Sequence, residues 1–136
     1  MEYGINITIT KEGMADLFWT CITSGSIGYG ALSLDCEKEV YTWARERLLD
    51  RNPNEMVCYE DVYKEVLLND GYILVNEYDE YDDTNSNIAR MCLDDLVDNF
   101  KDVEPSLILD MVNGNDDMCT HDEILQCLFL GEVVYG

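Results

Sequence analysis

Apolar residues alternate with polar ones over residues 5–9, and this period of two predicts a half-buried strand. Residues 72–78, with the sequence YILVNEY, are predicted to form a second strand. After the first of them, apolar positions three and four residues apart predict a helix that begins after Thr10, whose hydroxyl can cap the first amides. The buried face of that helix is expected to consist of Met14, Leu17, Phe18, Cys21 and Ile22.

The same spacing predicts further helices over residues 34–50, 59–68, 88–100 and 106–112. Glycines at 25, 28 and 30 mark a tight turn after the first helix, and Pro53 interrupts the chain after the second. The inward face of the helix at 88–100 is expected to contain Ile88, Met91, Cys92, Leu96 and Phe100.

The last helix is predicted to begin at Thr120 and to end at Gly131. Thr120 and Glu123 have the spacing of a capping box, in which each side chain accepts an amide at the start of a helix. Helices therefore outnumber strands, and we expect an α+β fold, predominantly helical, with a small β-sheet. The 136 residues contain no linker-like segment, so residues 1–136 are expected to form a single domain.

The composition predicts a folded protein that does not bind nucleic acid directly. Apolar residues make up 47% of the chain, which is too many for a disordered acidic tail. The chain has 29 acidic and 8 basic residues, with a formal net charge of −21. Contacts to phosphates require Lys and Arg in numbers that this chain lacks.

Several features predict a cytosolic protein. An acid at position 2 and the lack of a basic region before an apolar one argue against a secretory signal peptide. Residues 17–34 carry no charge except at their flanks, but their Gly, Ser and Thr content favours a buried helix followed by a turn over a membrane span. The six cysteines form no CxxC pair, which favours reduced thiols.

Motifs for catalysis are sparse. The single histidine, His121, falls in the first turn of the last predicted helix, where a capping or surface role is expected. A Ser-His-Asp arrangement stays open because its members meet only in space, although no GxSxG sequence is present. The glycine-rich turn lacks the lysine of a phosphate-binding loop. We expect no enzymatic activity and no cofactor.

No metal-binding pattern is complete. Cys119, His121 and Cys127 do not have the spacing of a zinc finger, and the His-x-Glu sequence at His121 lacks the later PCxxC of a zinc deaminase. Acidic loops that start at Asp79 and at Asn113 lack the glycine and the final glutamate of a calcium-binding loop. We expect no metal site.

The acidic residues are unevenly distributed. Residues 1–70 contain 13 acids and 6 bases, a net charge of −7, whereas residues 71–136 contain 16 acids and 2 bases, a net charge of −14. On the predicted helix, Asp94, Asp98 and Asp102 recur every four residues, at steps of about 6 Å. Beside the second strand, carboxylates two residues apart would be separated by about 6.6–6.8 Å.

Phosphates along a DNA strand have a similar separation, so such rows could occupy the basic groove of a DNA-binding protein. The alternative is a solvated surface that only keeps the protein soluble. The candidate contact carboxylates are Glu77, Asp79, Glu80, Asp82, Asp83, Asp94, Asp95, Asp98 and Asp102.

Two segments resemble small uncharacterised phage and prophage proteins. Residues 15–29 are similar to their helix followed by a glycine-rich turn, and residues 125–136, which end in GEVVYG, are similar to their C-terminus. The chain departs from that pattern at Gly30, where the family has tryptophan, and at Leu130, which separates Phe129 from Gly131. The resemblance implies a phage origin. By its charge the chain also resembles anti-CRISPR and anti-restriction proteins that mimic DNA.

These observations predict an inhibitor of a bacterial defence nuclease, such as a CRISPR effector, that acts in the host cytoplasm by mimicking DNA. Two alternatives stay open. One is a non-catalytic module that holds a small ligand or signalling nucleotide, in a pocket formed by the turn at residues 25–29 and the apolar C-terminus. The other is an oligomeric phage accessory protein with Trp19, Trp43 or Tyr135 at an interface.

Overall fold

The computed structural model describes residues 8–25 and 27–136. These residues form six α-helices and a three-stranded antiparallel sheet, which confirms the predicted α+β class with a predominance of helix. The helices are α1 (Lys11–Ile22), α2 (Lys38–Arg51), α3 (Tyr59–Leu68), α4 (Leu93–Asn99), α5 (Pro105–Val112) and α6 (Met118–Leu130), with short 3-10 turns η1 (Gly28–Gly30) and η2 (Phe100–Asp102). The strands are β1 (Leu32–Asp35), β2 (Ile73–Asp79) and β3 (Thr84–Met91).

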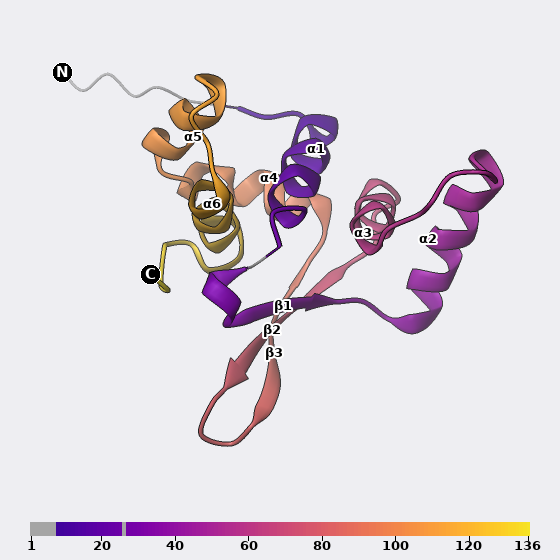
Figure 1. Ribbon diagram of the computed structural model, residues 1–136, viewed down its shortest axis with the longest axis horizontal. Coiled ribbons are helices and arrows are strands. Elements are labelled where there is room, and N and C mark those ends of the chain that lie inside the picture. The colour runs from indigo at the N-terminus through magenta and orange to yellow at the C-terminus, as the bar shows by residue number, and fades with distance from the viewer. Residues whose placement is uncertain (1–7, 26) are drawn as a thin grey trace.

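The helices gather around one end of the sheet, and the other end projects from them (Figure 1). Strand β2 is central in the order β1-β2-β3, with Leu32 opposite Glu77 and Thr84 opposite Asp79. Helix α1 packs on α3, α4 and α6, whereas α2 is the outermost helix and packs on α3. The free part of the β2–β3 hairpin therefore extends beyond the helical body.

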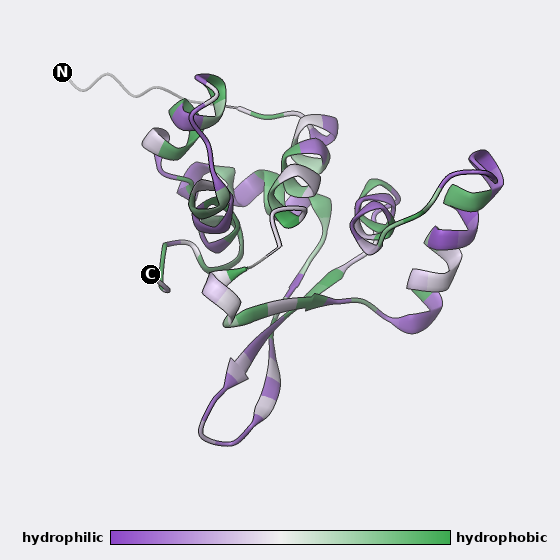
Figure 2. Ribbon diagram, in the orientation of Figure 1, coloured by the Kyte–Doolittle hydropathy of each residue, from purple (hydrophilic) through white to green (hydrophobic). Residues whose placement is uncertain are grey.

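Apolar faces of the helices form one core. Phe18 of α1 meets Phe129 of α6 edge to face, with ring centroids 6.4 Å apart, and Leu96 of α4 is fully buried beside them. Val66 of α3 and Val75 of β2 extend the same core to the sheet. Hydrophobic residues line the facing sides of these elements, while the hairpin tip is hydrophilic (Figure 2).

Several predicted elements are confirmed. The Thr10 hydroxyl accepts the Gly13 amide at 3.0 Å and caps α1, whose predicted apolar face is buried or half-buried. Helix α3 has the predicted bounds, and β2 and α5 differ by one residue. The strand predicted at residues 5–9 lies mostly outside the described residues, and Thr8 and Ile9 belong to neither a helix nor a strand.

Two predicted helices begin too early. The helix predicted over residues 34–50 overlaps strand β1, which covers residues 32–35. This segment forms a strand because pairing with β2 buries Leu32. Residues 88–91, assigned to a helix over 88–100, belong to β3, and Ile88 is 40% exposed instead of facing the core. Pairing of β3 with β2 overrides the helical spacing of Ile88, Met91 and Cys92.

The start of the last helix also differs from the prediction. Asp117, not Thr120, is the N-cap of α6, and its carboxylate accepts the Thr120 amide at 2.9 Å. Thr120 occupies the third helical position and accepts the Asp117 amide in return. Gly131 ends the helix with φ 83°, as predicted for a C-terminal glycine.

Candidate functional site

The tip of the β2–β3 hairpin carries the largest concentration of carboxylates on an exposed element. Strand β2 ends at Asp79, β3 begins at Thr84, and all residues from 78 to 88 are exposed. Tyr81 at the turn is 99% exposed. No Lys or Arg occurs between Lys64 and Arg90. The acidic hairpin, defined as Glu77, Asp79, Glu80, Asp82 and Asp83, is therefore a projecting element without a cation of its own.

Three of these carboxylates bond to neutral donors nearby. Asp79 Oδ1 accepts the Tyr81 amide at 2.9 Å, Asp83 Oδ1 accepts the Tyr78 hydroxyl at 2.5 Å, and Glu77 accepts the Tyr135 hydroxyl. Neutral donors fix the geometry of a carboxylate without cancelling its charge.

The other two acids of the hairpin, Glu80 and Asp82, make no side-chain hydrogen bond or ion pair with a described residue. None of the five carboxylates forms an ion pair within the described part of the chain. The hairpin therefore carries five negative charges that no cation among the described residues compensates.

The tyrosines beside these acids stay protonated at neutral pH. The hydrogen bond to Asp83 raises the pKa of Tyr78, and burial and the charges of Glu80 and Asp79 act in the same direction. The hydrogen bond to Glu77 raises the pKa of Tyr135 in the same way. Both phenols therefore remain hydrogen-bond donors to their carboxylates.

The second set of predicted contact carboxylates, at positions 94, 95, 98 and 102, lies in and after α4, and two of its members already have partners. Asp94 forms an ion pair with Lys11 at 3.0 Å, and Asp95 caps α4 by accepting the Cys92 amide at 2.9 Å. Asp98 is exposed, but α4 ends at Asn99, so Asp102 lies in η2 and does not continue a helical row. Strand β3 separates this set from the hairpin tip by about 25 Å along its eight residues. The structure does not bring the two sets together.

A groove of about 540 Å³ lies beside the β2 strand of the hairpin and extends to Tyr81 at its turn. The η1 turn borders it on one side, and the Tyr78 amide joins the hairpin to this turn by donating to the Ala31 carbonyl at 2.9 Å. Gly28 and Tyr29 of the predicted glycine-rich turn line the groove, whereas Gly25 does not. The lining residues are Gly28, Tyr29, Gly30, Ala31, Glu77, Tyr78, Asp79, Glu80, Tyr81, Tyr135 and Gly136.

The turn that borders the groove depends on glycine. Gly28 has φ 59°, and a Cβ there would come within 2.8 Å of the Leu32 side chain. Tyr29 follows with φ 52°, which is uncommon for a residue with a side chain, and Gly30 has φ 91°. This sequence of positive φ values keeps the backbone of the turn close to β1 and the hairpin.

Two buried polar residues of α6 hold the turn and the C-terminal segment in place. The Asp122 carboxylate accepts the amides of Gly28 and Tyr29, both at 2.9 Å, and the Gln126 amide group at 2.8 Å. Gln126 also donates to the Tyr135 carbonyl at 3.0 Å and accepts the amides of Val134 and Tyr135, both at 2.8 Å.

Sequence reasoning missed Asp122 and Gln126, although two polar residues four apart on an apolar helix face are a signal for such a network. The network brings residues 28–29 against residues 134–135. The glycine-rich turn and the C-terminal segment therefore lie side by side.

The single histidine joins α1 to α6. His121 Nδ1 contacts the Ser24 hydroxyl, and Nε2 lies 2.6 Å from Asp116 Oδ2. The side chain is largely buried, so the expected capping or surface role is wrong.

The backbone around Ser24 is unsuited to stabilising an oxyanion. The amides of Ser24 and Gly25 donate to the carbonyls of Cys21 and Ile22 at 3.3 and 3.4 Å, so neither is available to an acyl oxygen. The C-terminal end of α1 also carries partial negative charge, which opposes an oxyanion. The Ser24–His121–Asp116 contacts link the segment after α1 to the start of α6.

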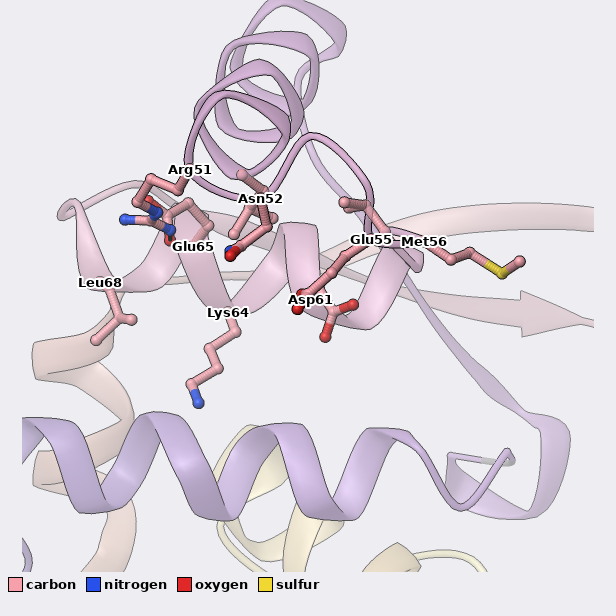
Figure 3. Close-up of a pocket in the computed structure, with 10 residues that line it drawn as sticks. Arg51, Asn52, Glu55, Met56, Asp61, Lys64, Glu65 and Leu68 are labelled. Carbon is pink, nitrogen blue, oxygen red and sulfur yellow. Dashed lines mark hydrogen bonds and ion pairs between the residues drawn. The ribbon is translucent and has the colours of Figure 1, made fainter.

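A second hollow of about 300 Å³ lies between α2 and α3 (Figure 3). Four of its five charged side chains have a partner, and the fifth, Glu55, forms no ion pair with a described residue. Arg51 binds Glu65 at 2.6 Å, and Lys64 extends toward α1, where it binds Asp16 at 2.6 Å. Asp61 accepts the Trp19 indole at 2.8 Å. These side chains fasten α1 and α2 to α3 and leave little unsatisfied chemistry for a ligand.

The sequence also raised the questions of a metal site, of disulfide bonds and of a membrane span. No three side chains among His, Cys, Asp and Glu cluster so as to hold a metal ion within residues 8–25 and 27–136. All six cysteines lie in those ranges and are free thiols, and Cys21, Cys36 and Cys127 are buried. No helix in the described ranges combines the length and apolar character needed to cross a membrane.

Comparison with known proteins finds no matching family model, no matching curated protein and no matching solved structure.

Proposed function

We propose that this protein is a phage-encoded, non-catalytic inhibitor of a bacterial defence nuclease, of the anti-CRISPR or anti-restriction kind. It acts in the host cytoplasm and occupies the basic nucleic-acid groove of the enzyme in place of nucleic acid. The observation that carries this proposal is the acidic hairpin, a projecting two-stranded element with five carboxylates and no cation. The phage origin rests on the resemblance of residues 15–29 and 125–136 to phage proteins.

The shape of the hairpin suits insertion into a groove. Its two strands lie about 4.7–4.9 Å apart, and residues two apart on one face, such as Glu77 and Asp79, are separated by about 6.6–6.8 Å. Carboxylates at this spacing can accept charge-assisted hydrogen bonds from the Arg and Lys residues that otherwise bind successive phosphates. The net charge of −21 also steers encounter with a basic surface.

Within this proposal, the nine carboxylates predicted from the sequence divide into a primary and a secondary group. The hairpin acids form the primary contact because their charges are uncompensated. Asp98 and Asp102 are available for a secondary contact at the far end of β3, whereas Asp94 and Asp95 already bond to Lys11 and to the Cys92 amide.

The proposal is tested by capture from bacterial lysate at low salt, with duplex DNA and guide RNA as competitors. We expect recovery of a basic nuclease that either competitor displaces and that is released as the salt concentration rises. Recovery of a partner that is indifferent to both competitors and to salt, or of no partner, would contradict the proposal.

Charge reversal on the hairpin locates the contact. With the captured nuclease, the double variant Glu80→Lys/Asp82→Lys is expected to bind about 30- to 100-fold more weakly, because two attractive contacts become repulsive. The matched control Glu46→Lys/Asp50→Lys makes the same change in net charge on exposed positions of α2, away from the hairpin. An equal loss in both variants would show that net charge, and not the hairpin, determines binding.

A further inference from the structure

The groove between the η1 turn and the β2 side of the hairpin offers no free backbone amide from the glycine-rich turn. The amides of Gly28 and Tyr29 donate to Asp122, and those of Gly30 and Ala31 donate to the carbonyls of Ile27 and Gly28. All four backbone amides of the turn are therefore engaged inside the protein. A glycine-rich turn binds phosphate through free amides, so this turn is unsuited to an anion such as the phosphate of a signalling nucleotide.

Carboxylates on the opposite wall reinforce this preference. Glu80 has no side-chain partner among the described residues. Asp79 uses only Oδ1 in its bonds to backbone amides, and Glu77 uses only Oε2 in its bond to Tyr135. Unused carboxylate oxygens therefore remain on all three acids that line the groove, and no Lys, Arg or His lines it. The charge of the groove therefore favours a cation over an anion.

Aromatic rings favour a planar cation. The tyrosines at positions 29, 78 and 81 line the groove and are exposed. A guanidinium group can lie on an aromatic face while its fixed fork of N–H groups binds carboxylates, whereas an ammonium group binds as a point charge. The protein already stacks guanidinium groups in this way, since Arg90 lies 4.1 Å from the ring centroid of Tyr72 and Arg47 lies 4.8 Å from that of Trp43.

We infer that this groove binds an arginine side chain of the protein partner, held by Glu77, Asp79 and Glu80 and stacked on an exposed tyrosine. The inference rests on the proposed function, because it places one arginine of the basic groove of the nuclease between the acidic hairpin and the η1 turn. It differs from simple charge attraction in requiring arginine specifically.

Two labelled peptides, hexa-arginine and hexa-lysine, test this preference by fluorescence anisotropy with the full chain at physiological salt. Their charges are equal, so the long-range attraction to the net negative charge of the protein is the same for both. We expect hexa-arginine to bind at least about fivefold more tightly, the contribution of one stacked guanidinium. Equal affinities for the two peptides would overturn the inference.

Matched variants locate the site. Glu80→Gln and Asp82→Asn each remove one charge from the hairpin, but only Glu80 lines the groove. We expect Glu80→Gln to weaken hexa-arginine binding severalfold more than Asp82→Asn does. Tyr81→Leu is expected to bring the two peptide affinities closer together. Equal effects of Glu80→Gln and Asp82→Asn, or an unchanged peptide ratio in Tyr81→Leu, would contradict the assignment.

These measurements separate the two proposals. Capture of a nuclease that the hairpin reversal abolishes, together with equal peptide affinities, would leave the proposed function standing and remove the arginine site. A preference for hexa-arginine that depends on Glu80, without capture of a nuclease, would support the site and contradict the proposed partner.

Discussion

The α2–α3 hollow and the acidic hairpin place carboxylates in opposite situations. In the hollow, Glu65 is only 4% exposed and receives Arg51 at 2.6 Å, Arg47 at 3.5 Å and the Asn69 side chain at 3.2 Å. On the hairpin, Glu80 and Asp82 are exposed and have no side-chain partner among the described residues.

The difference follows from where the basic residues fall in the chain, since six of the eight precede residue 70. Four of these six, Lys11, Arg47, Arg51 and Lys64, form ion pairs. This acidic protein therefore concentrates its cations where carboxylates are buried or join helices. The carboxylates of the hairpin form no ion pair within the described residues.

The largest expected effect is a loss of stability on substitution of Glu65, the buried carboxylate of the α2–α3 hollow. Glu65→Ala should lower the free energy of unfolding by about 2–3 kcal/mol, because it removes charge-assisted hydrogen bonds at a buried position. Glu80→Ala makes the same chemical change on the hairpin and should stay within about 0.5 kcal/mol of the wild type. Urea denaturation measures both variants. A comparable loss in the two would mean that the hairpin acids also stabilise the fold.

Acid should remove the contribution of Glu65. Burial raises the pKa of this carboxyl, but Arg51, Asn69 and Arg47 outweigh burial, so the folded-state pKa lies below the ordinary value of 4.5. A lowered folded-state pKa gives stability that is present above pH 4.5 and is lost as the pH falls through the folded-state pKa. The difference in unfolding free energy between wild type and Glu65→Gln should therefore shrink between pH 6 and pH 3. A difference that is constant with pH would contradict the ion-pair explanation.

The smallest effect is a change in titration on the hairpin. Because Asp83 raises the pKa of Tyr78, Asp83→Asn should shift the titration of Tyr78 to lower pH, as measured by tyrosinate absorbance. Since the folded state favours the neutral phenol, this bond stabilises the hairpin below pH 10 and is lost as the pH rises through the folded-state pKa. The variant Tyr78→Phe serves as the control, because the part of the absorbance titration that it removes belongs to Tyr78. An unchanged titration in Asp83→Asn would show that the hydrogen bond between Tyr78 and Asp83 is absent in solution.

Elements whose apolar pattern is local could be predicted from the sequence. Helices α1 and α3 follow from apolar positions three and four apart, and the end of α6 follows from Gly131. Strand β3 could not be predicted in this way, since its sequence TNSNIARM has no clear alternation and only pairing with β2 makes it a strand. The short edge strand β1 has four residues and depends on the same sheet.

The candidate site could be predicted only in part. The carboxylates of the hairpin are consecutive enough to be recognised from the sequence, and the glycine-rich turn also indicates a special backbone. The sequence could not predict that the hairpin acids and the turn both lie beside Tyr135. This arrangement depends on Asp122 and Gln126 of α6, whose side chains bond to segments far apart in the chain. The separation of Asp94 from the hairpin acids likewise depends on the direction of β3, which the sequence pattern leaves undetermined.

Gln126 has a consequence for how related sequences can vary. Its side chain donates to Asp122 and to the Tyr135 carbonyl and accepts two backbone amides, which uses both donors and both acceptor positions of a primary amide. Glutamate would lack the donors, methionine would lack both functions, and asparagine would be one methylene too short. Relatives of this chain that keep the turn and the C-terminal segment should therefore retain glutamine here, even where the apolar residues around it are exchanged for one another.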